Sequence, residues 1–591
     1  MEARASLNDI LNTAFERHIR RSLRSEELEG YEQYFIDPLG SEVLLEAGAQ
    51  ILYGRGGTGK TLVSSALTQR AAAVAKDSRV GAVHFTATDF QYVPDYDNET
   101  SIHEKTHVYF HLFIQQLCDK LVLLTDSLLE QPGWWQTLTV DGGEALRRRE
   151  LVQKLLNDLT DAARYGVLIS EPGKKEASYE SAERGASKYS LGGTAGMGAS
   201  PSGAKLRAGL HAQAARGFES ESSTHTSFIS NWRFSPLAVK DILIRVIDAL
   251  ELSHLVVFID EWMTLDECQV DFADRLRKTF MHESRIAVKI ATDRFQTKFN
   301  NSAEGSAFRG IDVGRDASIA LDLDTTFTDI EAMKDFFATA LYVRMKVFDE
   351  RMRVHFGDPP EWNRQRFIGS VFASPHAFTE ACAASHGICR DFYEVMRLAY
   401  KQAGPINRQN RITVDHVRSS VIAMSTPLYT RAAESPIANS MLFELLAPHI
   451  RKTRSRYFAV QSSDRHTHAL AGLNSKRIVH PISSQRLHPT LRGRFEVFEI
   501  SACVYLDLMR AVEWSTGEEV DDRYSDDEVL TITENTVNNY LLSPADVRAA
   551  ADGVQRLCPY CLTEFSEKER AFAARRICPS CFKDQEVTSD G

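Results

Sequence analysis

The sequence predicts an α/β fold with a parallel sheet, followed by a helical unit. Apolar runs of strand length at residues 80–85, 255–259, 286–291 and 319–323 alternate with stretches of helical periodicity. The run at 255–259, Leu-Val-Val-Phe-Ile, is apolar throughout, which is typical of a central parallel strand covered on both faces. Helical patterns then dominate residues 329–424. We therefore expect alternating strands and helices first and an α-helical unit after them.

Residues 50–62 combine a short apolar strand, a glycine-rich loop and the start of a helix. The loop matches the G-x-x-x-x-G-K-[ST] pattern of a phosphate-binding P-loop. Its glycines let backbone N–H groups point inward, and the helix N-terminus adds partial positive charge. Lys60 is expected to reach the β- and γ-phosphates, and Thr61 to hold Mg²⁺. The predicted nucleotide-binding residues are Gly54, Arg55, Gly56, Gly57, Thr58, Gly59, Lys60 and Thr61.

Length and composition set further bounds. At 591 residues the chain is too long for a single core, so several domains are expected. The formal net charge of −11 argues against a protein that coats nucleic acid over its whole surface, yet it allows a local basic patch. The N-terminus lacks the features of a signal peptide, and no apolar run approaches the ~18 residues that span a bilayer. We expect a cytoplasmic protein with no membrane partner.

Carboxylates follow the apolar run at 255–259. Asp260 stands where it would lie beside the P-loop and hold the Mg²⁺ shell through water. Glu261 is placed to polarise the attacking water as general base. The next strand ends in Thr292 and Asp293, and a polar side chain there can hydrogen-bond the γ-phosphate or the attacking water. Thr292 is the first choice for this role and Asp293 the second.

Two later stretches carry a resemblance to a known family. Residues 387–392 read Gly-Ile-Cys-Arg-Asp-Phe, and residues 412–417 read Ile-Thr-Val-Asp-His-Val. Here the chain resembles AAA+ ATPases, and more narrowly the branch related to origin-recognition initiators. In that family a lid helix begins with a Gly-x-x-Arg-[Asp] stretch whose arginine contacts the γ-phosphate, so the resemblance makes Arg390 the sensor arginine. A guanidinium on a separate lid would make lid position depend on nucleotide state.

The resemblance covers residues 7–427, apart from a long insertion between about 125 and 235. It implies an N-terminal helix and ATPase core at 1–328, with a Gly/Ala/Ser-rich insertion at about 171–226, and a helical lid at 329–430. Two departures stand out: Cys389 replaces the usual proline before the sensor arginine, and the usual sensor asparagine is absent. Family members often form oligomers in which an arginine finger completes a neighbour's site. Three arginines are candidates for that finger: Arg294, Arg309 and Arg315.

Residues 440–512 have their own character. Helical patterns and a strand at 494–501, with Gly493 at a hairpin turn, are compatible with a winged helix, which the resemblance also implies after the lid. Between 451 and 494 one aspartate accompanies ten basic residues, a formal charge of +9. The ten are Arg451, Lys452, Arg454, Arg456, Arg465, Lys476, Arg477, Arg486, Arg492 and Arg494. We expect salt-dependent, weakly sequence-specific contact with double-stranded DNA. The alternative is a solvated or partner-binding face.

The C-terminal part holds an acidic stretch and a cysteine cluster. Residues 513–528 contain eight acidic residues, and 513–550 is expected to be an acidic linker and helix. Two C-x-x-C pairs follow within a region at 551–585: Cys558, Cys561, Cys578 and Cys581. Their spacing predicts a zinc ribbon with tetrahedral Zn²⁺. Four thiolates leave no open position, so the zinc would be structural.

These features favour an ATP-binding and hydrolysing AAA+ switch that acts on DNA. Lys60, Glu261, Thr292 and Arg390 are its expected catalytic residues, with ATP and Mg²⁺ as cofactors and a separate effector protein as partner. Analogy with the family, together with the insertion and the ribbon, favours anti-phage defence or a mobile element. The alternative is a scaffold ATPase of the STAND type, which would recognise a protein partner and oligomerise.

Overall fold

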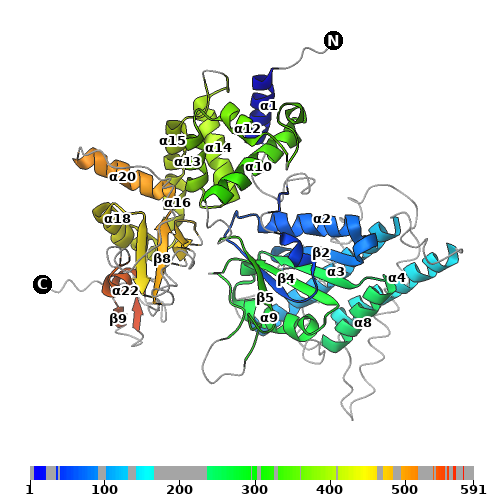
Figure 1. Cartoon of the computed structure of the whole chain (residues 1–591). Coiled ribbons are helices and arrows are strands. Elements are labelled where there is room, and N and C mark those ends of the chain that lie inside the picture. The colour runs from blue at the N-terminus through cyan, green and yellow to red at the C-terminus, as the bar shows by residue number, and fades with distance from the viewer. Residues whose placement is uncertain are drawn as a thin grey trace.

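A computed structural model gives the fold (Figure 1). It describes residues 6–20, 35–37, 40–90, 102–130, 142–165 and 236–461, with short gaps at 295, 302–307, 325–329, 360 and 408–409. In the C-terminal part it describes 470–482 except 471 and 475, then 494–516, 537, 541–552, 555–557, 564–566 and 577. The predicted insertion at 171–226, Gly493 and the four zinc-ribbon cysteines lie outside these residues.

A five-stranded parallel sheet forms the centre of the α/β domain. Its strands run in the order β2-β3-β4-β1-β5. Their bounds are β1 Gln50–Tyr53, β2 Val80–Thr86, β3 His254–Asp260, β4 Ile286–Thr292 and β5 Ser318–Asp322. All four predicted apolar runs are strands, each within a residue or two of its expected bounds. Because β4 lies between β1 and β3, the P-loop strand and the strand carrying Asp260 are not neighbours.

Helices cover both faces of this sheet (Figure 1). One face packs against α2 (Lys60–Ser78) and the short turn η3 (Ser41–Leu45) through a small apolar cluster. The other face is covered through a larger cluster that includes Phe90, Phe113 and Phe272. The elements on that side are η4 Ala87–Phe90, α3 Ile102–Glu130, α4 Gly142–Tyr165, α8 Pro236–Ala249, η5 Trp262–Cys268, α9 Gln269–Leu276 and η6 Arg277–Met281. Burial on both faces explains why the run at 255–259 in β3 is continuously apolar, whereas the edge strand β5 is partly exposed.

A helical lid follows the sheet, as predicted. Its helices are α10 Ile330–Phe348, α11 Met352–Phe356, α12 Arg364–Val371, α13 Pro375–Ala384, α14 Cys389–Ala403, α15 Val414–Ala423 and α16 Ser425–Ala433. The N-terminal helix α1 (Leu7–Arg20) packs on this lid, not on the sheet. Phe15 of α1 stacks on Tyr400 of α14 at 4.7 Å, and Asn12 bonds to the backbone of Ile406. The first helix, grouped with the ATPase core in the sequence analysis, thus packs against the lid.

The C-terminal region combines helices with a second sheet. Its elements are α17 Pro436–Ser440, η7 Met441–Leu446, α18 Ala447–Thr453, β6 Tyr457–Gln461, β7 Val479–Pro481, β8 Phe495–Ile500 and α20 Ala502–Thr516. The strands pair antiparallel in the order β6-β8-β7. Their core is continuous with that of the lid, so the two regions pack as one unit. Further along lie α22 (Pro544–Asp552) and an antiparallel pair, β9 (Gln555–Leu557) and β10 (Glu564–Ser566).

Candidate nucleotide-binding site

The P-loop connects β1 to α2 with the backbone that its glycines allow. Gly57 and Gly59 have φ of +98° and +105°, a conformation that side-chain-bearing residues rarely adopt. Gly54 N–H donates to Thr292 O at 3.0 Å, which ties the start of the loop to the end of β4. The Lys60 ammonium donates to the carbonyl oxygens of Gly54 at 2.6 Å and Arg55 at 3.1 Å. The loop is therefore a preformed cradle at the carboxyl edge of the sheet.

The charges of four carboxylates act on Lys60. Burial lowers the pKa of Lys60, and the negative charges nearby oppose that shift. The four groups are Asp260, Asp293, Asp324 and Glu261. Asp324, just after β5, is a functional candidate that the interpretation of the sequence missed. Its signal was available, because an acidic residue at the carboxyl end of a parallel strand faces the same edge as the P-loop.

Thr61 and Asp260, the two residues expected to hold Mg²⁺, lie in direct contact. The Thr61 hydroxyl hydrogen-bonds Asp260 Oδ2, and Asp260 is 1 % exposed at the end of β3. The backbone N–H of Glu261 donates to Asp260 Oδ1 at 2.8 Å. Glu261 has φ of +54°, which is uncommon for a residue with a side chain and costs backbone strain. Hydroxyl and carboxylate oxygens are ligands that Mg²⁺ prefers, so these residues fit the metal.

Thr292 and Asp293, the two candidate polar residues at the end of β4, have different surroundings. The Thr292 hydroxyl is fully buried and hydrogen-bonds the hydroxyl of Thr297. Its strand neighbours of the same parity, Val288 and Ile290, belong to the apolar cluster on the face opposite α2. Asp293 is 1 % exposed and is one of the carboxylates that act on Lys60. The charge of Asp293 therefore acts on Lys60, whereas the Thr292 hydroxyl is engaged by Thr297.

The lid helix α14 abuts the P-loop at its N-terminus. The backbone N–H of Arg390 donates to Gly57 O at 3.2 Å, and the Cys389 thiol lies 3.8 Å from Thr58 O. Cys389, where the family pattern has proline, therefore makes a contact of its own with the loop. The Arg390 side chain is exposed. The structure thus brings the predicted sensor helix to the loop through a backbone hydrogen bond and the Cys389 thiol.

The three arginine-finger candidates differ in their surroundings. Arg294 forms an ion pair with Asp322 at 2.7 Å and lies over the ring of Tyr53 at 4.8 Å. Arg309 lies 3.5 Å from Asp271 of α9. Arg315 is exposed on the turn that precedes β5. Arg294 is thus held within its own subunit beside the P-loop strand, which makes it the weakest candidate for a finger that enters a neighbour's site.

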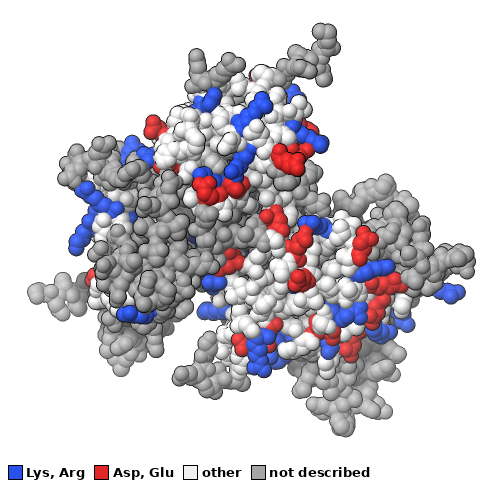
Figure 2. Space-filling model, viewed as in Figure 1, with Lys and Arg blue, Asp and Glu red and all other residues white. Residues whose placement is uncertain are grey.

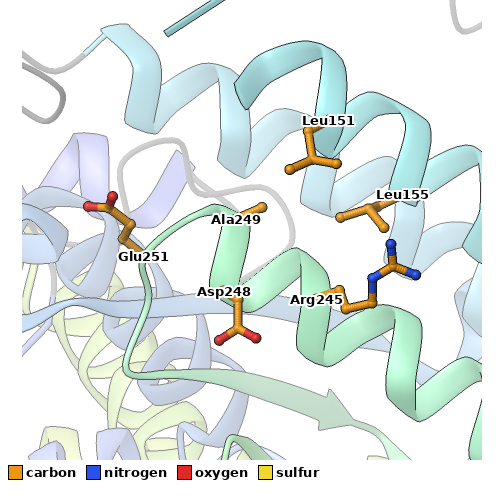
Figure 3. Close-up of a pocket in the computed structure, with 6 residues that line it drawn as sticks. All are labelled: Leu151, Leu155, Arg245, Asp248, Ala249 and Glu251. Atoms are coloured by element: carbon orange, nitrogen blue, oxygen red, sulfur yellow. The ribbon is translucent and has the colours of Figure 1, made fainter. Parts of the chain in front are cut away.

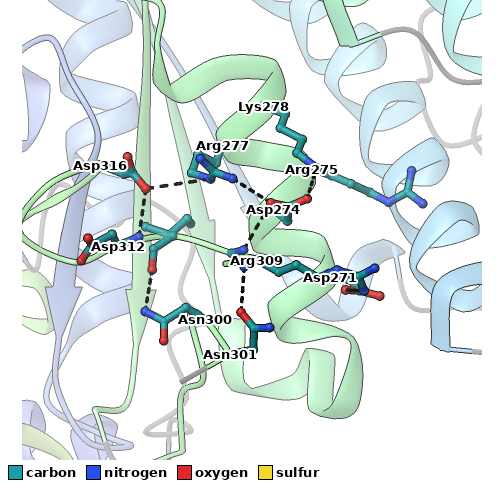
Figure 4. A network of polar contacts seen from close by, with 12 residues as sticks. Asp271, Asp274, Arg275, Arg277, Lys278, Asn300, Asn301, Arg309, Asp312 and Asp316 are labelled. Carbon is teal, nitrogen blue, oxygen red and sulfur yellow. Dashed lines mark hydrogen bonds and ion pairs between the residues drawn. The ribbon is translucent and has the colours of Figure 1, made fainter. Parts of the chain in front are cut away.

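A polar network anchors the connection between β4 and β5 to α9 (Figure 4). Asp274 is at its centre and accepts from Arg277 at 2.9 Å and from the backbone N–H of Gly310 at 3.3 Å. Lys278 pairs with the same carboxylate at 2.5 Å. Arg309 N–H donates to Asn301 Oδ1 at 2.7 Å in the same network. The segment that carries Arg309 and Arg315 is therefore fixed to the α/β domain.

A cavity of about 410 Å³ lies between α4 and α8, away from the P-loop (Figure 3). Leucines of α4 face the last turn of α8 across it. Its lining residues are Leu151, Leu155, Arg245, Asp248, Ala249 and Glu251. None of these belongs to the predicted site.

Several residues of the basic segment pair internally. Arg456 pairs with Glu499 at 3.0 Å, Lys476 lies 3.7 Å from Glu434, and Arg477 pairs with Asp391 of α14. Four others are exposed: Arg451, Lys452, Arg454 and Arg494. Arg465, Arg486 and Arg492 lie outside the described residues. On the face in Figure 2, acidic and basic side chains intermingle over the α/β domain, as expected for a protein without a wholly basic surface.

The described part of the chain holds neither a clustered metal site nor a membrane-spanning helix. No group of three or more His, Cys, Asp or Glu residues there has the geometry of a metal site. The four cysteines of the predicted zinc ribbon lie outside this part. Among the described helices, none is long and apolar enough to cross a membrane.

Comparison with known proteins gives little beyond the structure itself. No protein-family model matches the chain. No curated protein matches it either. A solved structure that it resembles is that of the ORC2 protein of Aeropyrum pernix, described as ADPNP-ADP complexes. The identity is 10 %, the TM-score is 0.25, and the match covers 81 % of this chain and 91 % of the other. At that TM-score the likeness carries no argument.

The fold class rests instead on the architecture of the chain. The P-loop follows β1, which lies next to the edge strand β5 of the five-stranded parallel sheet. β4 separates β1 from β3, the strand that carries Asp260, and the helical lid contacts the loop. The described residues thus form an α/β fold in which a parallel sheet with flanking helices carries a P-loop and is followed by a helical lid, and this part of the predicted fold class is confirmed.

Proposed function

We propose that the protein is an ATP-binding and hydrolysing AAA+ switch that couples nucleotide state to DNA binding and to recruitment of a partner. One observation carries the proposal: the Thr61 hydroxyl contacts Asp260 at the start of the helix that follows the P-loop, where Lys60 lies under the charge of four carboxylates. Lys60 would bind the β- and γ-phosphates. Thr61 and Asp260 would hold Mg²⁺, which supplies charge neutralisation of the phosphates. Glu261 would act as general base and Asp293, in place of Thr292, would orient the attacking water.

Arg390 would report nucleotide state through the lid. Support comes from the contact of α14 with the P-loop and from the core that the lid shares with the C-terminal region. Movement of α14 would be transmitted to the C-terminal sheet through this core, because packed cores move as units. Arg315, exposed and on an anchored segment, is the preferred arginine finger of a homo-oligomer.

Nucleotide binding is tested with the full chain and a fluorescent ATP analogue. Wild type should bind in the presence of Mg²⁺, and Lys60→Ala should lose the affinity, because it removes the ammonium group that the loop presents to the phosphates. Arg70→Ala is the charge control, since Arg70 is half exposed and pairs with Glu42 at the surface. Equal affinity of wild type and Lys60→Ala would refute the proposed site.

DNA binding is proposed for the exposed basic residues at the end of α18. Arg451 and Lys452 lie in its last turn, and Arg454 caps it. Replacing these three with alanine should weaken binding to double-stranded DNA and reduce its dependence on salt concentration. Arg70→Ala with Arg149→Ala is the matched control, because both residues are exposed and lie on the α/β domain. No binding of wild type at low salt would refute this part of the proposal.

The alternative is a STAND-type scaffold ATPase that recognises a protein partner. The internal pairing of Arg456, Lys476 and Arg477 favours it, because these residues contribute less charge to an exposed patch than the sequence count suggests. ATP-dependent oligomerisation without affinity for DNA would support the scaffold. A role in anti-phage defence or a mobile element remains part of the proposal and rests on family analogy.

We also propose that the C-terminal cysteines form a structural zinc ribbon. The antiparallel strands β9 and β10 flank Cys558 and Cys561 in sequence. Such a hairpin is a common support for a C-x-x-C pair that binds Zn²⁺.

A further inference from the structure

The P-loop is joined to the C-terminal sheet by a direct side-chain contact. Arg55 belongs to the loop, and its guanidinium is 2 % exposed and pairs with Asp324, with Nε 2.8 Å from Asp324 Oδ1. The other end of the guanidinium contacts His480 Nδ1. Since an arginine can only donate, Nδ1 of His480 accepts, and a neutral ring carries its proton on Nε2.

His480 belongs to β7 and is 4 % exposed. Its ring stacks on that of His386 at 3.9 Å with an interplanar angle of 20°. His386 lies just before α14 and accepts from the backbone N–H of Ala502 at 3.2 Å through Nε2. P-loop, lid and C-terminal region therefore meet at the two histidines.

A second tether joins the lid to the C-terminal region close by. Arg477, three residues before His480, pairs with Asp391 of α14. Burial raises the pKa of Asp391, while the positive charges of Arg477 and Arg55 oppose the shift. Asp391 thus lies near the P-loop arginine as well as its own partner. We call Arg55, His386, Asp391, Arg477 and His480 the junction.

We propose that the junction couples the P-loop to docking of the C-terminal region, so that bound nucleotide and docking stabilise one another. The inference rests on nucleotide binding at the P-loop. Undocking would remove His480 Nδ1, which accepts a hydrogen bond from the buried Arg55 guanidinium. The Arg55 side chain would then rearrange, and the conformation of the P-loop would change with it. Any ligand that pulls the C-terminal region away would speed nucleotide release, because coupling between two sites is reciprocal.

The test is the dissociation rate of N-methylanthraniloyl-ADP from the full chain. His480→Ala should raise the rate by roughly fivefold or more, the lower end of typical coupling. His480→Asn should stay near wild type, since its side-chain oxygen can replace Nδ1 as acceptor. His376→Ala is the matched control, because His376 is half exposed on the lid. Arg477→Met breaks the second tether and should also raise the rate.

Hydrogen exchange provides a second measurement. The nucleotide should increase protection of backbone amides in β7 of wild type, and this increase should be absent in His480→Ala. If wild type binds the nucleotide but neither His480→Ala nor Arg477→Met changes its dissociation, the junction proposal is wrong and the proposed function stands. If wild type does not bind the nucleotide, the proposed function fails and this inference fails with it.

Discussion

At Gly57 the P-loop and the lid make a close approach. A Cβ added there would meet Cβ of Arg390 at 2.8 Å and Cγ2 of Ile388 at 3.2 Å, in a backbone with φ of +98°. Gly57→Ala therefore combines backbone strain with a collision against α14. We expect it to weaken binding of a fluorescent ATP analogue by about tenfold, as a strain of about 1–3 kcal/mol allows.

Gly40→Ala is the control for strain alone. Gly40 has φ of +72°, but a Cβ there has nothing within 4 Å. It should leave nucleotide affinity unchanged. Equal losses in the two variants would mean that the contact between Gly57 and the lid has no special role.

Asp293 and Thr292 give a second prediction at the scale of single residues. Asp293→Asn keeps the shape of the side chain but removes a carboxylate that acts on Lys60. It should lower kcat by roughly 10- to 100-fold, with little change in nucleotide affinity. Thr292→Ala loses the bond to Thr297 and should cost about 1 kcal/mol of stability while kcat is retained. The reverse pattern in steady-state kinetics would restore Thr292 to the role.

The sequence could not decide between these two residues for a physical reason. Neighbouring residues of a strand face opposite sides of the sheet, so only one of them can face the P-loop. β4 is buried along its whole length and, apart from Lys289 and the terminal Thr292, it is apolar, so it offers no regular alternation that would reveal which side is which. The P-loop and the Asp260–Glu261 pair were predictable because each is a local pattern in a defined strand context.

At the scale of elements, α9 and the connection after β4 depend on Asp274. Burial would raise the pKa of Asp274, but hydrogen bonds from Lys278 and Arg277 outweigh it and hold the pKa below its usual value. A depressed carboxyl pKa stabilises the folded state above the unfolded pKa, and that contribution is lost as pH falls through the folded pKa. Asp274→Asn should therefore destabilise the protein by about 1–3 kcal/mol at pH 7.

Thermal melting as a function of pH checks this prediction. The difference between wild type and Asp274→Asn should shrink as pH falls below about 4, where the wild-type carboxyl begins to take up a proton. Asp126→Asn is the control, because Asp126 pairs with Arg149 in an exposed position and should have a small effect. A difference that stays constant with pH would contradict the role of the charge.

The zinc prediction also belongs to this scale. Cys558→Ser should lower the zinc content of the purified protein. A chelator should remove zinc from wild type and so destabilise the β9–β10 hairpin. Cys118→Ser is the matched control, since Cys118 is buried in α3. Elemental analysis reports about one zinc per chain for wild type if the ribbon forms. A zinc content near zero in wild type would refute it.

The apolar runs in the sequence predicted the bounds of the strands well. They did not predict which elements pack against one another. The apolar face of α1 indicated that this helix is buried, but amphipathicity does not say against what. The structure places it on the lid through Phe15 and Tyr400. Phe15 precedes the α/β domain in the sequence and Tyr400 follows it, and no local sequence pattern encodes a contact between such distant residues.

At the scale of the whole molecule, the lid and the C-terminal region share one hydrophobic core. Charge counting along the sequence gave a basic segment, but it could not show that Arg477 pairs with Asp391 on another element. For the same reason His480 had no functional signal of its own. Its importance comes from tertiary contact with Arg55, which brings residues of the P-loop and β7 together.

The measurement that tests the central claim most directly is ATP turnover by Glu261→Gln under single-turnover conditions. We propose that Glu261 acts on the water and that Lys60, Thr61 and Asp260 hold the nucleotide and its Mg²⁺. Glu261→Gln should therefore bind ATP as wild type does but hydrolyse it at least about 100-fold more slowly. Wild-type hydrolysis by Glu261→Gln, or loss of ATP binding in that variant, would contradict the account.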